Sequence, residues 1–86
     1  MGKTVKTRVR VITENTTITD QDFSGWLAIN TGSGNVQVNK VVLQPREKLD
    51  FLTAIPSDCR WDDEIQIVIL AGGGEVTLTQ LLFKNK

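Results

Sequence analysis

Residues 64–83 read EIQIVILAGGGEVTLTQLLF, two apolar runs separated by three consecutive glycines. Aliphatic and β-branched residues dominate the first run, which predicts a central strand buried on both faces. In the second run apolar and polar residues alternate, which predicts a strand with Val76 and Leu78 toward the core. Because glycine enters positive-φ turn conformations freely, the glycines at 72–74 indicate a hairpin between the two strands.

The same alternation recurs through the rest of the chain. It predicts further strands, separated by segments rich in Gly, Asn or Pro, near residues 4–12, 17–19, 25–30, 35–39, 41–43 and 48–52. Seven or eight short strands at spacings of roughly 8–12 residues, with no helical periodicity, are typical of all-β domains. The sequence therefore predicts one all-β domain over residues 1–86. We expect an antiparallel β-sandwich (jelly-roll or immunoglobulin-like) or a small barrel.

The segment TVKTRVRVI at residues 4–12 predicts a half-buried strand with a basic outer face. The expected inward residues are Val5, Thr7, Val9 and Val11, and the expected outward ones are Lys6, Arg8, Arg10 and Ile12. Four positive charges in residues 1–10 contrast with a net of three negative charges in residues 58–64, DCRWDDE. Opposite patches of this kind can join copies head to tail. The interface hypothesis names Lys6, Arg8 and Arg10 on one side, and Trp61, Asp62 and Asp63 on the other.

The composition argues against most enzyme chemistry. The chain has no histidine and a single cysteine, Cys59. This removes histidine acid–base catalysis, the usual nucleophile–histidine pairs and almost every zinc site. The acidic residues 58–64 match no calcium-loop spacing, so a solvated loop is the preferred interpretation. We therefore expect a non-enzymatic protein with no catalytic residues, no metal and no cofactor.

Charge and hydropathy also limit the expected partners and location. Ten Lys and Arg balance ten Asp and Glu, so no net charge attracts nucleic acid or an anionic membrane. The longest apolar stretch, residues 67–71, is far shorter than the roughly 20 residues that span a bilayer. The first residues do not resemble a signal peptide, because they alternate charged and apolar residues. We expect a soluble protein, cytoplasmic during synthesis.

One segment resembles a known kind of protein. Residues 30–51, NTGSGNVQVNKVVLQPREKLDF, combine an N-x-G turn, a V-x-L strand and the pattern P-x-E-x-L-x-F. This is similar to small β-sandwich proteins of tailed bacteriophages and prophages that decorate capsids or build head–tail and fibre parts. The segment also resembles the P-G-E turn of cupin-like barrels, although Arg46 replaces the glycine and the cupin metal histidines are absent.

The resemblance implies a structural role and transfers no functional site. The leading hypothesis is a phage or prophage virion component that acts through homo-oligomerisation and contacts with other assembly proteins, and would then reside in the virion. The alternative hypothesis is a small carbohydrate-binding module that uses Trp61 and nearby carboxylates, because tryptophan rings can stack on sugars.

Overall fold

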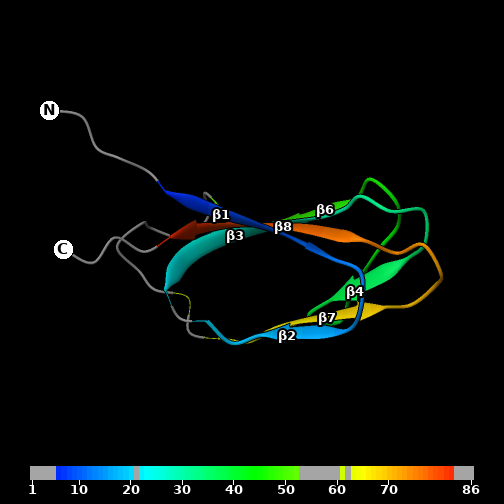
Figure 1. The fold of residues 1–86 in the computed structure, drawn as a ribbon, viewed down its shortest axis with the longest axis horizontal. Helices are drawn as coiled ribbons and strands as arrows, with labels where there is room; N and C mark the ends of the chain where they lie inside the picture. The colour runs from blue at the N-terminus through cyan, green and yellow to red at the C-terminus, as the bar shows by residue number, and fades with distance from the viewer. Residues whose placement is uncertain (1–5, 21, 53–60, 62, 83–86) are drawn as a thin grey trace, which may run out of the picture.

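Eight strands form two antiparallel four-stranded sheets in the computed structural model, which describes residues 6–20, 22–52, 61 and 63–82 (Figure 1). The first sheet has the order β1 (Thr7–Ile12), β8 (Val76–Leu82), β3 (Phe23–Asn30), β6 (Lys48–Asp50). The second has the order β2 (Thr16–Ile18), β7 (Ile65–Ile69), β4 (Val36–Val38), β5 (Val41–Leu43). The described part of the chain contains no helix. The prediction of an antiparallel all-β fold is confirmed.

The strand order identifies the kind of sandwich. The strands of the first sheet connect to those of the second in the pairs β1 and β2, β8 and β7, β3 and β4, and β6 and β5. The two strands of each pair occupy the same position in their respective sheets. Each layer therefore contains one strand of every pair. Eight strands in two sheets of this order form a jelly roll. The order differs from the immunoglobulin arrangement, which places four strands against three.

The predicted hairpin at residues 72–74 is wrong, because β7 and β8 lie in different sheets. The glycines instead carry the chain across the gap between the sheets, beside the crossing of residues 31–35 from β3 to β4. Where a Cβ at Gly32 would lie, Gly73 O is 2.1 Å away, so only glycine permits this approach. Three backbone hydrogen bonds join the crossings: Thr31 N–H to Glu75 O (2.8 Å), Ser33 N–H to Gly73 O (2.9 Å) and Leu70 N–H to Asn35 O (3.0 Å).

The core lies between the sheets and follows the alternation along each strand. Phe23 and Trp26 are its largest fully buried side chains. The Trp26 ring packs against Phe51 at 4.9 Å between centroids and edge-on against Trp61 at 5.4 Å, so aromatic side chains fill one part of the core. Strand β7 is central, as expected, but only one face is buried, because Gln66 is exposed. Other buried apolar residues are Ile12, Ile18, Ala28, Val36, Val38, Leu43, Ile65, Ile67, Val76 and Leu78.

Two tight turns place non-glycine residues in the left-handed region. Asn39 (φ 49°) and Lys40 (φ 71°) join β4 to β5 in a tight reversal, and the two strands pair at Val38 and Val41. Between β5 and β6, Glu47 N–H donates to Gln44 O (2.9 Å), with Pro45 and Arg46 in the middle. Arg46 has φ 75°, the value that a type II turn requires at its third residue and that glycine adopts most easily.

Asn30, at the end of β3, connects both sheets through a buried side chain. Its Nδ2 donates to Gly34 O and to Leu43 O, both at 2.9 Å. Its Oδ1 accepts from Gly32 N–H at 3.0 Å. Because all its side-chain hydrogen-bonding groups are used, this amide can be buried without a large desolvation cost. The N-x-G pattern of the sequence therefore forms a hydrogen-bonded connection between the two sheets.

Replacing Asn30 should destabilise the domain strongly. Asn30→Ala leaves the carbonyls of Gly34 and Leu43 and the Gly32 N–H without their partner, and each buried unpaired group costs about 1–3 kcal/mol. We expect the free energy of unfolding to fall by about 3 kcal/mol or more, measured by urea titration. The control is Asn35→Ala, at an exposed neighbouring position. It should lower the free energy of unfolding by less than about 0.5 kcal/mol.

Replacing Arg46 by glycine should stabilise the domain. A left-handed conformation costs an L-residue roughly 1–2 kcal/mol, against about 0.5–1 kcal/mol of extra unfolded-state entropy for glycine. We expect Arg46→Gly to raise the free energy of unfolding by about 0.5–1 kcal/mol in the same titration. Arg46→Ala removes the guanidinium but keeps the Cβ, so it should not show this gain. An equal gain in both variants would assign the effect to the charge.

Candidate functional site

The side chains of strand β1 point to the opposite sides of the sheet from those expected from the sequence. Val9 and Val11 are about 60% exposed (59% and 60%), whereas Arg8 and Arg10 are half-buried and Ile12 is buried. The prediction that Lys6, Arg8 and Arg10 form a basic outer face is therefore wrong for the two arginines. The reason is that β1 is an edge strand, where a long arginine side chain can start between the sheets and still extend its charged end to the open side.

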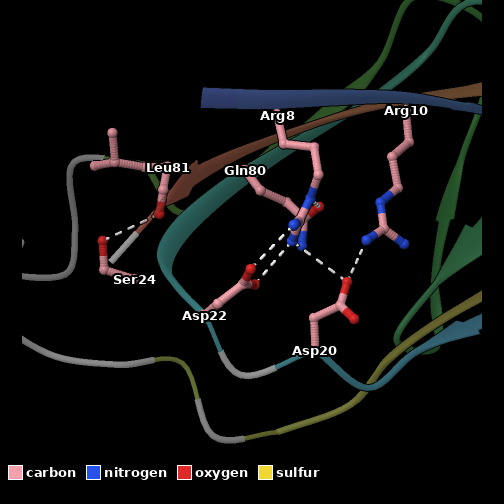
Figure 2. Close-up of polar contacts among 7 residues, drawn as sticks. All are labelled: Arg8, Arg10, Asp20, Asp22, Ser24, Gln80 and Leu81. Atoms are coloured by element: carbon pink, nitrogen blue, oxygen red, sulfur yellow. Dashed lines mark hydrogen bonds and ion pairs between the residues drawn. The ribbon is translucent and has the colours of Figure 1, made fainter. Parts of the chain in front are cut away.

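Carboxylates of the segment between β2 and β3 meet these arginines (Figure 2). Arg8 Nη1 and Nη2 donate to the two carboxylate oxygens of Asp22 at 3.0 and 2.8 Å, a bidentate pair. Arg8 Nη2 also lies 3.3 Å from Asp20 Oδ2, to which Arg10 donates as well. On the inner side, Arg8 Nε donates to Gln80 Oε1 of β8 at 3.0 Å. The network joins β1, β8 and the start of β3.

The network perturbs two titrating groups. The hydrogen bond from Arg8 lowers the pKa of Asp22, and the arginine's charge adds to this effect against partial desolvation. Reciprocally, the hydrogen bond to Asp22 raises the pKa of Arg8 above its ordinary value. Charge-assisted bidentate contacts of this kind favour both ionised forms. Two arginines and two aspartates thus neutralise one another within the chain.

The structure does not bring the remaining residues of the sequence-based interface into one patch with the arginines. Lys6 is exposed at the start of the described chain. Trp61 is half-buried, because it packs on the core beside Phe51 at 5.4 Å between ring centroids. Asp63 is exposed, and Asp62 lies outside the described residues. The head-to-tail contact stays a prediction, but the charges of Arg8 and Arg10 already have partners in their own chain.

The outer surface of the first sheet is the feature that sequence reasoning missed. Strands β1, β8 and β3 carry no charged residue on it. The strand registers align its residues in two cross-strand rows. We call these rows the aspartate row, which contains Val9, Thr79, Leu27 and Asp50, and the lysine row, which contains Val11, Thr77, Ile29 and Lys48. Together they form the aliphatic face.

The outer surface of the second sheet differs in composition. Its outward positions include Thr17 on β2, Gln66 and Val68 on β7, Gln37 on β4 and Val42 on edge strand β5. Amide and hydroxyl side chains on an outer face are typical of a sandwich layer in contact with water. On the aliphatic face, each row instead has two aliphatic side chains around a threonine. The two layers are therefore unequal, and the first carries the candidate interaction surface.

Within residues 6–20, 22–52, 61 and 63–82, no three Asp, Glu or Cys side chains group as metal ligands would. No helix of the described part is long and apolar enough to cross a membrane. Comparison with models of protein families, with curated proteins and with solved structures found no match.

Because of the arginine–carboxylate network, the free energy of unfolding should decrease at acidic pH. Since the folded pKa of Asp22 is lowered, its contribution is present above the unfolded value, near 3.9, and is lost as the pH falls through the folded pKa. At neutral pH we expect Asp22→Asn to lower the free energy of unfolding by about 0.5–1 kcal/mol, because the pair is largely exposed. Urea titrations from about pH 6 to pH 2 should show the two proteins converging in acid.

The control for this experiment is Asp63→Asn, at an exposed carboxylate that forms no ion pair with any described residue. Its stability should run parallel to that of the unmodified chain over the whole pH range. If Asp22→Asn also ran parallel instead of converging, the ion pair with Arg8 would make no contribution to stability.

Proposed function

We propose that this chain is a non-enzymatic structural or assembly protein that acts through homo-oligomerisation and protein–protein contacts. The observation that carries the proposal is the aliphatic face. Val9 and Val11 are exposed on it, and Leu27, Ile29 and the two threonines are only half-buried. A contiguous, largely apolar surface whose charges lie only at its β6 edge is typical of a protein interaction site.

The size of the surface sets the expected strength of the contact. From strand spacing and rise, two rows across four strands span roughly 260 Å² per copy. This is about a third of the 800 Å² per partner of a standard interface, so we expect affinities in the micromolar to millimolar range. Several copies held together, or a larger partner, would add the remaining strength.

We propose further that the assembly is a bacteriophage or prophage particle. The resemblance of residues 30–51 to phage β-sandwich proteins supports this, and the jelly roll is compatible with it, because capsid domains use this fold. Lectins and cupins use it too, so the fold alone does not choose a function. Carbohydrate binding through Trp61 stays a prediction, and no structural observation favours it, since the ring packs beside Trp26 and Phe51.

Solution mass tests the assembly role. We expect light scattering during size exclusion to show a mass above 9.5 kDa that rises with protein concentration up to about 1 mM. Because apolar burial is not screened by salt, the association should persist or strengthen in 1 M sodium chloride. Association lost in salt would instead support the charged head-to-tail contact. A monomer at every concentration and salt would contradict homo-oligomerisation.

A further inference from the structure

We propose that a second copy of this chain covers the aliphatic face, related by a two-fold axis that runs across the strands at the level of Ala28 and Leu78. This inference rests on the proposed assembly role and gives it a partner and a geometry. Ala28 and Leu78 stand opposite each other in the register, between the aspartate row and the lysine row. Rotation by half a turn about this axis lays each row over the other row of the second copy.

The two rows are complementary under this rotation. Asp50 of one copy then faces Lys48 of the other, and the reverse pair forms at the same time. Both side chains are exposed on edge strand β6, two residues apart, and Leu49 between them packs inward. Opposite charges at matching ends of two rows are what an isologous contact requires, because each copy must present both partners.

The uncharged parts of the rows match in the same way. Leu27 faces Ile29 of the second copy, and Val9 faces Val11, so aliphatic side chains of similar size meet. Thr79 faces Thr77 of the second copy, and these hydroxyl groups can act as donors and acceptors for each other. After the half-turn, each aliphatic residue of the face meets an aliphatic residue, and each charge meets an opposite charge. This match favours a second copy over an unrelated partner.

Pairing between strand edges is a less suitable route to the same dimer. The longest edge strand, β1, points Arg8 and Arg10 toward the interior side, where Asp20 and Asp22 hold them. Inward-pointing charges on an edge strand oppose its extension by another strand. The other edge strands, β6, β2 and β5, have three residues each and offer few ladder hydrogen bonds. Face-to-face stacking is therefore the contact that the described sheets favour.

Complementary charge reversal tests the axis. In a homodimer, Lys48→Glu places two carboxylates opposite each other in both of the pairs at the β6 edge, and Asp50→Lys does the same with two ammonium groups. Each single variant should dimerise about 10-fold more weakly than the unmodified chain at low salt. In a heterodimer of the two variants, both pairs at the β6 edge again join opposite charges, so we test an equimolar mixture. The mixture should therefore associate about as strongly as the unmodified chain, measured by sedimentation equilibrium or light scattering.

Two further variants separate the face from the axis. Leu27→Glu puts a charge in the middle of the aliphatic face, and should weaken association at least 100-fold. Gln66→Glu adds the same charge on the outer surface of the second sheet, and should leave association unchanged. Thermal unfolding of every variant, followed by circular dichroism, checks that each one folds. Asp50→Lys also removes the acceptor of Leu52 N–H (2.9 Å), so it needs this check most.

The outcomes distinguish the failure of each proposal. A monomeric unmodified chain at all concentrations would overturn both homo-oligomerisation and this dimer. An oligomer that survives Leu27→Glu would leave homo-oligomerisation standing and overturn the aliphatic face as its contact. An oligomer that Leu27→Glu dissociates, but whose charge-reversed variants show no recovery on mixing, would overturn the two-fold axis.

Discussion

The buried amide of Asn30 is the interaction on which the arrangement of the two sheets depends. Its backbone ends β3 in the first sheet, accepting from Arg46 N–H at 2.8 Å and donating to Glu47 O at 2.9 Å. Its side chain holds Gly34 and Leu43, which precede and end the β4–β5 hairpin of the second sheet. One residue thus ties the crossing from β3 to β4 to the crossing from β5 to β6. These two crossings carry the chain from one sheet to the other. The first sheet, which carries the aliphatic face, is positioned by them.

Much of the fold could be predicted from local patterns, because period two reports which residues share a face. Val76 and Leu78 are buried as expected. Strand β1 shows the limit of this reasoning. Both faces of TVKTRVRVI contain an aliphatic residue, so alternation separates the faces but does not decide which one points inward. That choice depends on Asp20 and Asp22, which reach Arg8 from 12 and 14 residues away. Three glycines likewise indicate a change of direction, but not whether the next strand joins the same sheet.

The candidate surface could not be predicted, since its residues come from four strands that are not consecutive. Leu27 and Thr79 are neighbours only because β8 lies between β1 and β3, an order that no local pattern specifies. The two arginines that sequence reasoning selected for the interface have another task. They keep the interior side of an edge strand charged, which leaves the aliphatic residues of the same strand facing outward. One edge strand thus restricts pairing along its length and supplies part of the surface for stacking.

The place of β8 in the first sheet has a consequence for the making of the protein. Residues 76–82 pair with β1 on one side and β3 on the other, so until this late segment is made β1 has no partner in its sheet and β3 has only β6. Strand β7 has the same position between β2 and β4. At about 5–20 residues per second, β1 remains without a partner strand for some seconds. Pairing between strands so distant in sequence is also slow. Both sheets can therefore be completed only once β7 and β8, the last two strands in the sequence, have been made.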